Sequence, residues 1–199
     1  MSVNILLDYL PETVEISGKE YFVDTDYRTF MIFEKIISSS ERSDRKVYDT
    51  VFLFYPDEKP TDLPAALDAV LHLYKCGDTA QKPARVRKNG NVELKPKLIY
   101  DYEYDAPYIY AAFLAQYGID LIDTDYLHWW KFQALFKSLE NHNKIVEIMG
   151  YRAADLSKIE LPRERERIAQ MKSLYALPQN LSFEDKVAMA GAAFGGCFA

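Results

Sequence analysis

The sequence has very few of the residues that build zinc sites and disulfide frameworks. Its 199 residues include two cysteines, Cys76 and Cys197, and three histidines, His72, His128 and His142. The cysteines are far apart, and neither has a second cysteine or a histidine at the spacing of zinc ligands. We therefore expect two reduced thiols, as is usual in the cytoplasm, with no metal and no cofactor.

Motifs for nucleotide binding and for nucleophilic catalysis are also missing. The chain has no glycine-rich phosphate loop, no dinucleotide fingerprint and no nucleophile elbow. Serines 38–40 have no base nearby in the sequence. Cys76 is predicted at a helix end, whereas activated thiols favour helix starts. These absences argue against an enzyme.

Long apolar runs and a basic charge balance are absent as well. No stretch of about 18 apolar residues occurs, and residues 1–10 do not resemble a secretory signal. The 24 Lys and Arg residues stand against 30 Asp and Glu residues, which gives a net charge of -6. Since general nucleic-acid binders present a basic face, we expect a cytoplasmic protein that binds neither nucleic acid nor membrane.

Apolar and aromatic residues are plentiful, at 49% and 14% of the chain. Their spacing predicts a mainly α fold, namely a single helical domain over residues 1–180 with six to seven helices. Apolar residues alternate on both sides of Ser17-Gly18, which predicts a small N-terminal β-hairpin. Residues 181–199 are small and glycine-rich, so we expect a flexible tail.

Capping residues and apolar periodicity predict where the helices begin and end. Asp105 is expected to cap one helix, and Asp123, Thr124 or Asp125 to cap the next. The helix over residues 126–139 has apolar residues on two faces, which predicts burial on both sides and a place at the centre of the fold. The expected helices cover residues 27–37, 43–54, about 63–77, 105–117, 126–139, 143–149 and 162–175.

Acidic residues gather between Asp101 and Asp125. Converging carboxylates are the ligands that Mg²⁺ and Ca²⁺ prefer, so a metal-dependent enzyme is one hypothesis. Helix capping is the favoured interpretation, because several of these residues precede predicted helices. The residues concerned are Asp101, Glu103, Asp105, Asp120, Asp123 and Asp125.

The composition changes between residues 78 and 97. Lysines and arginines predominate there and large apolar residues nearly disappear, which predicts a long exposed basic loop. Nucleic-acid binding through Lys82–Lys97 is a further hypothesis. Single-strand binders use interleaved aromatic residues for stacking, and this segment has none. A solvated or partner-contacting loop is therefore favoured.

Two groups of residues are candidates for protein binding. Tyrosines are dense between residues 100 and 110, and tyrosine is enriched in buried interface cores. Core packing explains the same tyrosines equally well. The helix over residues 162–175 is strongly charged and has one narrow apolar stripe, as expected for a helix that awaits a partner. The candidate partner-binding residues are Tyr102, Tyr108, Ile168, Met171, Leu174 and Tyr175.

Three segments carry a family resemblance. They are the run from Tyr104 to Leu121, the hexapeptide Leu127-His128-Trp129-Trp130-Lys131-Phe132 and the pentapeptide Ile148-Met149-Gly150-Tyr151-Arg152. Together they resemble the bacteriophage "gene product fifteen" family of phages and prophages of Gram-positive bacteria. The resemblance is strongest between Leu98 and Lys158. It brings no catalytic residues with it.

The resemblance implies a protein encoded among tail morphogenesis genes, just before the tape-measure protein. By analogy of gene order, it implies a helical, non-enzymatic tail assembly chaperone in the host cell cytoplasm. The expected partner is the tape-measure protein or the tail-tube protein, and self-association is left open. The alternative is a structural component retained in the phage tail or neck.

Overall fold

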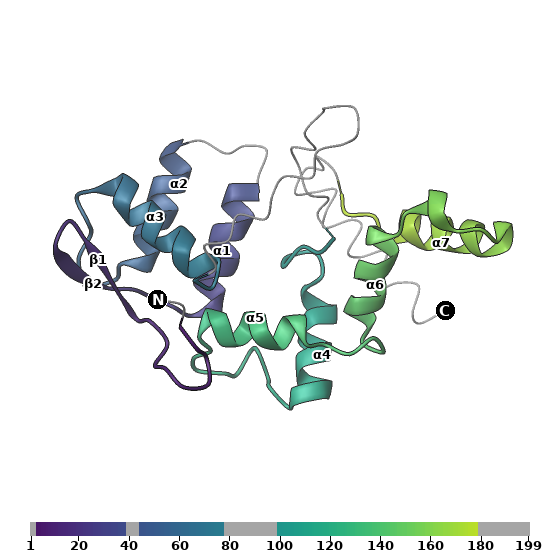
Figure 1. The fold of residues 1–199 in the computed structure, drawn as a ribbon, viewed down its shortest axis with the longest axis horizontal. Helices are drawn as coiled ribbons and strands as arrows, with labels where there is room; N and C mark the ends of the chain where they lie inside the picture. Colours follow the sequence, from purple (N-terminus) through teal and green to yellow (C-terminus); the bar gives the residue numbers. More distant parts are fainter. Residues whose placement is uncertain (1–2, 39–43, 78–98, 179–199) are drawn as a thin grey trace.

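The computed structural model describes residues 3–38, 44–77 and 99–178. These residues form seven α-helices, two short 3-10 helices and one two-stranded antiparallel sheet (Figure 1). The predicted mainly helical fold with a small N-terminal β-hairpin is confirmed. The basic loop at residues 78–97 and the tail at residues 181–199 lie outside the described residues, and the single domain over residues 1–180 stays a prediction.

The hairpin joins β1 (Thr13–Ile16) to β2 (Lys19–Phe22), and Ile16 pairs with Lys19 across the turn. Ser17 and Gly18 both have positive φ angles, 52° and 80°. Type I′ turns need a positive φ at both central residues. They are favoured in two-residue hairpins because their twist matches the twist of the flanking strands. β1 lies against α3 (Leu63–Tyr74), with Ile16 buried, so the hairpin does not stand alone.

α1 (Tyr27–Ser38), α2 (Asp44–Val51) and α3 pack together at the same end of the molecule as the hairpin (Figure 1). α2 tightens into the 3-10 helix η1 (Phe52–Phe54), where one helix was expected to continue to residue 54. The Asp62 carboxylate accepts a hydrogen bond from the Ala65 amide and so caps α3, as capping preferences predict. The side chains of Ile37 and Val47 lie outside the described ones.

The second half of the chain forms the remaining helices. α4, α5 and α6 follow one another, and α7 lies at the far end of the molecule beside α6 (Figure 1). A short 3-10 helix, η2, connects α6 to α7. The elements are α4 (Ala106–Tyr117), α5 (Trp129–Lys137), α6 (Lys144–Ala153), η2 (Leu156–Lys158) and α7 (Pro162–Leu174).

Two predicted helix boundaries are wrong. α5 begins at Trp129 instead of residue 126, and its cap is His128, not one of the carboxylates at residues 123–125. α6 continues through Gly150, where it was expected to end, because Ile148 and Arg152 on either side of the glycine are both buried. Tertiary packing thus overrides the local stop signal.

Asp105 precedes α4 as predicted but does not cap it. No hydrogen bond joins its side chain to the first turn of α4. The carboxylate instead accepts two hydrogen bonds from the Arg152 guanidinium and one from the Asp101 amide. A fully buried carboxylate is stabilised far more by a guanidinium than by one peptide N–H, and this explains why the ion pair replaces the cap.

α5 lies at the centre of the core, buried on both sides as its two apolar faces predict. Trp129 stacks on Phe30 of α1, with ring centroids 5.0 Å apart, and on Phe132 one turn along α5. Phe132 in turn stacks on Tyr27 and on Phe113 of α4, each at 5.0 Å. This continuous aromatic stack connects α1, α4 and α5.

Both tryptophan indoles donate hydrogen bonds to the end of α3. Trp129 Nε1 lies 2.9 Å from the Tyr74 carbonyl oxygen, and Trp130 Nε1 lies 2.8 Å from that of Leu73. The last carbonyls of a helix have no partner within the helix, and a buried indole N–H also needs an acceptor. Both indole N–H groups thus have an acceptor, and they bind α5 to the C-terminal end of α3; the Leu73 carbonyl also accepts from the Cys76 amide.

His128 connects this pair to the N-terminal segment. Its Nδ1 accepts a hydrogen bond from the Trp130 amide at 3.0 Å, so the proton of the neutral ring lies on Nε2, 3.2 Å from the Pro11 carbonyl oxygen. Trp129 also donates from its amide to Thr25. Burial lowers the pKa of His128 below the ordinary value of 6.5.

The depressed pKa of His128 predicts a pH-dependent stability. Below about pH 6.5 the unfolded chain binds a proton that folded His128 does not, so the free energy of unfolding decreases as the pH falls from there toward the folded-state pKa. His128→Asn keeps a capping acceptor and removes this titration. We expect a smaller pH slope between about pH 7.5 and about pH 5.5 in urea unfolding of the variant.

His142→Asn is the matched control, because the His142 side chain is 70% exposed. Its unfolding free energy should follow the pH dependence of the unchanged chain. An undiminished slope in His128→Asn would contradict the assignment of a buried neutral imidazole.

Candidate partner-binding surfaces

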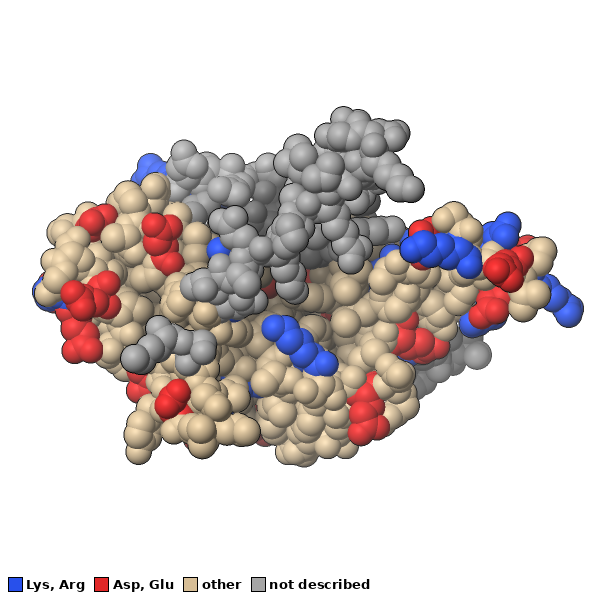
Figure 2. All heavy atoms as spheres, in the orientation of Figure 1, with Lys and Arg blue, Asp and Glu red and all other residues tan. Residues whose placement is uncertain are grey.

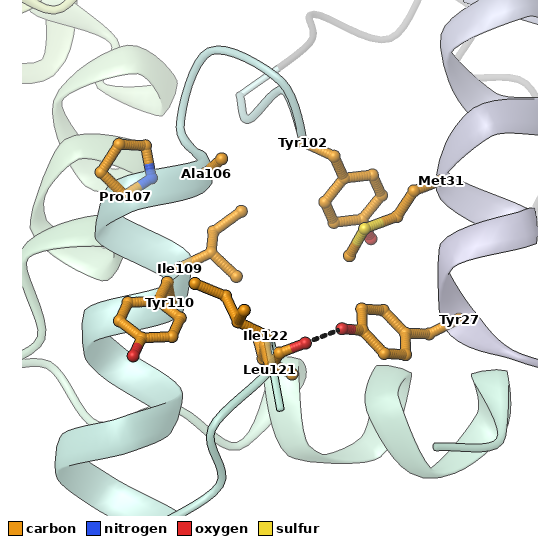
Figure 3. A pocket seen from close by; sticks show the side chains of 9 residues that line it. All are labelled: Tyr27, Met31, Tyr102, Ala106, Pro107, Ile109, Tyr110, Leu121 and Ile122. Carbon is orange, nitrogen blue, oxygen red and sulfur yellow. Dashed lines mark hydrogen bonds between the residues drawn. The ribbon is translucent and has the colours of Figure 1, made fainter. Parts of the chain in front are cut away.

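An apolar pocket of about 380 Å³ opens between α1, α4 and the loop that follows α4 (Figure 3). None of its lining side chains carries a charge. Pockets that bind ligands or side chains are mostly apolar with a few polar groups, and here those groups are tyrosine hydroxyls. The lining residues are Tyr27, Met31, Tyr102, Ala106, Pro107, Ile109, Tyr110, Leu121 and Ile122.

Helical spacing places most of these residues. Tyr27 and Met31 lie one turn apart on α1, so both point to the same side. Ala106 and Pro107 form the first turn of α4. Proline is tolerated there because a backbone N–H in the first turn has no partner within the helix. Ile109 and Tyr110 follow one turn later, and Ile109 is buried.

The loop after α4 is held in place by Gly118 and Asp120. Gly118 ends α4 with a φ of 66°, a conformation that favours glycine. The Asp120 carboxylate accepts hydrogen bonds from the Ile122 and Asp123 amides and from the Tyr110 hydroxyl. The bond from the Ile122 amide is the largest cause of the lowered pKa of Asp120. The loop therefore presents Leu121 and Ile122 in a fixed position.

α1 fastens the same loop from the other side. The Tyr27 hydroxyl donates a 2.6 Å hydrogen bond to the Leu121 carbonyl oxygen (Figure 3). Arg28 Nη2 donates to the carbonyls of Leu121 and Thr124 at 3.0 and 2.6 Å. Burial raises the pKa of Tyr27, so its hydroxyl keeps the donated proton at neutral pH. The pocket is thus lined by side chains whose backbones are already fixed.

An exposed apolar side chain lies at the edge of the pocket. Ile122, which lines it, is 74% exposed. An exposed branched aliphatic side chain is unremarkable alone. Next to an uncharged pocket, it extends the apolar surface that a partner would cover.

The structure separates the six predicted partner-binding residues into two places. Tyr102 lines the pocket, where its ring packs edge-on against Trp129 and Phe132 and its hydroxyl accepts a hydrogen bond from Gln133 Nε2. Burial raises its pKa strongly. Tyr102 therefore forms a partly buried wall of the pocket and is not a freely exposed surface residue.

Of the other five, Tyr108 lies in the first turn of α4, and the remaining four lie on α7 or at its C-terminal end. Ile168, Met171 and Tyr175 are partly buried, and Leu174 is 66% exposed. Tyr175 stacks on Tyr151 of α6, and its carbonyl oxygen accepts a hydrogen bond from Arg152 Nε. Burial raises the pKa of Tyr108, and the neighbouring Tyr175 raises it further. Packing against α6 thus uses part of the predicted stripe.

Charge is distributed unevenly over the surface. Acidic side chains gather at the end that carries the hairpin and α3, whereas the α7 end shows both signs side by side (Figure 2). Along α7, arginines at 163, 165 and 167 alternate with glutamates at 164 and 166. The mixed pattern gives this helix no strong preference for a partner of one sign.

Three of the six acidic residues that suggested a metal site have structural roles in the fold. Asp105 pairs with Arg152, Asp101 accepts hydrogen bonds from the Glu103 and Tyr104 amides, and Asp120 holds the loop after α4. Across residues 3–38, 44–77 and 99–178, no three His, Cys, Asp or Glu side chains are placed to hold a metal ion.

One buried carboxyl group has an unusual environment. Glu34 is 8% exposed and accepts a 2.6 Å hydrogen bond from the Tyr74 hydroxyl. Burial raises the pKa of Glu34 and, with the neighbouring carboxylate, that of Tyr74. Neither group lines the apolar pocket, so the pair is best explained as a satisfied polar contact within the core.

Most of the pocket was missed by sequence reasoning. Among its lining residues, Tyr102 was a named candidate, and Tyr110 belongs to the tyrosine-dense segment that was considered for an interface. A signal was present in Ile119, Leu121 and Ile122, which are large apolar residues in a segment between a helix-ending glycine and the next helix. Loops with such residues either fold onto the core or bind a partner, and here Leu121 does the first while Ile122 stays exposed.

Comparison with known proteins identifies the family. The model of the family described as Bacteriophage Gp15 protein matches residues 6–177, which is most of the chain. The chain belongs to this family. The Gp15 family suggests a structural or morphogenetic role in a bacteriophage. No curated protein and no solved structure matches the chain.

In this Gp15 family member, none of the helices within the described ranges combines the length and the apolar character that crossing a bilayer requires.

The Asp105–Arg152 pair positions both candidate surfaces, which makes it a test of the arrangement. The two side chains are 0% and 3% exposed, and Arg152 also donates to the Ile99 and Tyr175 carbonyls. Arg152→Met leaves a buried carboxylate unpaired, so we expect a loss of about 3–5 kcal/mol in the free energy of unfolding measured with urea.

Adding Asp105→Asn to Arg152→Met removes the uncompensated charge. The double variant should therefore lose less stability than the two single changes summed. Lys144→Met is the control, since its ion pair with Glu147 is about half exposed, and its effect should stay within about 1 kcal/mol. Strict additivity in the double variant would contradict a coupled buried pair.

Proposed function

We propose that this Gp15 family member is a non-enzymatic tail assembly chaperone. It binds an apolar helical segment of the tape-measure protein, or of the tail-tube protein, in the cytoplasm of a Gram-positive host. The proposal deepens the structural or morphogenetic role that the family suggests. The gene-order analogy favours the tape-measure protein as the first client to test.

The uncharged pocket between α1 and α4 is the observation that carries this proposal. A helix that docks in a groove inserts apolar side chains at i, i+3 or i+4 and i+7, and the groove must be apolar to receive them. The pocket is large enough for a few aliphatic side chains and bears tyrosine hydroxyls instead of charges. Binding of this kind requires no catalytic group at the site.

Several structural roles of the charged groups support a function without chemistry. Among the carboxylates proposed above as metal ligands, Asp105 pairs with Arg152, and Asp101 and Asp120 accept hydrogen bonds from backbone amides. His128 caps α5 and binds Pro11. These four groups have roles in the fold, and none lines the apolar pocket.

Retention in the finished tail or neck is the second candidate, because the Gp15 family suggests structural as well as morphogenetic roles. The chaperone and the structural component are distinguished by the composition of the purified virion. A chaperone is released before assembly is complete, whereas a structural component is found in purified particles at a fixed copy number.

Ile122→Asp tests the pocket, since it places a charge at its rim without disturbing the core. With the tape-measure protein co-expressed as client, we expect affinity capture to weaken by about tenfold or more, which corresponds to the loss of one good apolar anchor. Light-scattering mass of the captured complex gives the number of chains per client.

Two variants at other exposed apolar residues complete the design. Leu53→Asp changes a 49% exposed residue of η1, away from the pocket lining, and should leave capture unchanged. Leu174→Asp tests the predicted α7 stripe. If Leu174→Asp abolishes capture while Ile122→Asp does not, α7 is the binding face and the pocket assignment is wrong.

A chain that captures neither the tape-measure protein nor the tail-tube protein would overturn the chaperone proposal. Finding it in purified virions would then favour the structural alternative.

A further inference from the structure

A short segment near the N-terminus exposes more apolar surface than any other in the described ranges. Residues 3–9, named the arm here, contribute five of the thirteen exposed large apolar side chains. Leu6, Leu7 and Tyr9 are 88%, 82% and 101% exposed. The other eight are spread singly over the described elements, and single exposed apolar residues need no explanation.

The arm is a defined turn. The Leu7 and Asp8 amides donate to the Asn4 carbonyl oxygen at 3.0 and 2.9 Å. The Asn4 side chain accepts from the Leu6 amide, and the Asp8 carboxylate accepts from the Asn4 amide at 2.8 Å. These local hydrogen bonds give backbone amides of the arm acceptors within the arm, and its apolar side chains remain exposed to solvent.

The base of the arm is attached to the core. Leu10 packs against the core, and the Pro11 carbonyl oxygen binds His128 at the beginning of α5. In Figure 1 the arm runs below the beginning of α5, whereas the pocket lies between α1 and α4. The fold thus holds the arm and the pocket in separate places on one molecule.

The arm and the pocket match in chemistry. Residues 3–7 carry no charge, and the single charged residue of the arm, Asp8, is hydrogen-bonded within it. The lining of the pocket carries no charge either. Burying one against the other leaves no unpaired charge, which is the condition that makes an apolar contact favourable.

We propose that the arm of one copy of this chain inserts its Leu6 and Leu7 side chains into the apolar pocket of a second copy. Each copy presents both an arm and a pocket, so the contact joins two different surfaces. Such contacts close into reciprocal pairs or rings, or they continue as open series. The inference goes beyond the proposed function, because it requires no client.

A consequence concerns the client. Because the same pocket is assigned to the client helix, the arm of a neighbouring copy and the client compete for it. Free copies associate through their arms, and a client that enters the pocket displaces them.

Sedimentation equilibrium of the full chain alone tests the contact. We expect a mass that rises with concentration above the 23.0 kDa of one chain. Leu6→Asp with Leu7→Asp changes the arm, and Ile122→Asp changes the pocket. Each should raise the dissociation constant for self-association by about tenfold or more, whereas Leu53→Asp should leave it unchanged.

Mixing the two defective variants gives the decisive result. The arm variant still has an intact pocket, and the pocket variant still has an intact arm. An arm-into-pocket contact therefore predicts that the mixture forms mixed pairs although each variant alone does not. A shared fold defect predicts no such recovery, and urea unfolding of each variant checks that the fold is intact.

Three outcomes would overturn the inference. The unchanged chain could stay at one-chain mass at all concentrations, the arm variant could associate as the unchanged chain does, or the mixture could fail to recover. A different result would overturn the proposed function alone: self-association would persist, but neither the tape-measure protein nor the tail-tube protein would be captured. Because the arm and the client compete for the pocket, the arm variant should capture the client at least as tightly as the unchanged chain, and weaker capture would contradict this competition.

Discussion

The hydrogen bonds from the two α5 indoles to the end of α3 are the interaction on which most of this structure depends. They bring the C-terminal carbonyls of α3 to the beginning of α5. His128, one residue earlier, binds Pro11 and so fixes the segment that leads to the hairpin. With Trp129 held in this way, its ring stacks on α1 and orders the aromatic core that positions α4.

Local signals in the sequence predicted much of this fold, and the exceptions have one cause. Ser17-Gly18, Asp62 and Gly118 act within a few residues, so their turn, cap and stop were predictable. Asp105 and Gly150 depend on Arg152, which reaches Asp105 only in the folded chain. The start of α5 likewise depends on His128 and its contact with Pro11, more than a hundred residues away.

The candidate site was less predictable than the fold. Its lining comes from three segments, and no single one shows a pocket in its periodicity. Tyr102 was a candidate because tyrosine favours interfaces, whereas Tyr27 and Ile109 follow the ordinary pattern of core residues. In the folded chain these three residues differ from ordinary core residues because they line an open pocket. The exposed Leu6 and Leu7 of the arm were equally inconspicuous, because exposure is a property of the folded chain.

The proposed client helix binds between α1 and α4. Hydrogen–deuterium exchange of the full chain, with and without the tape-measure protein, locates the contact. We expect client-dependent slowing of exchange at residues 27–32, 102–110 and 119–122, with α7 little changed. Slowing confined to residues 162–175, or no slowing in a complex that demonstrably forms, would contradict this placement of the client helix.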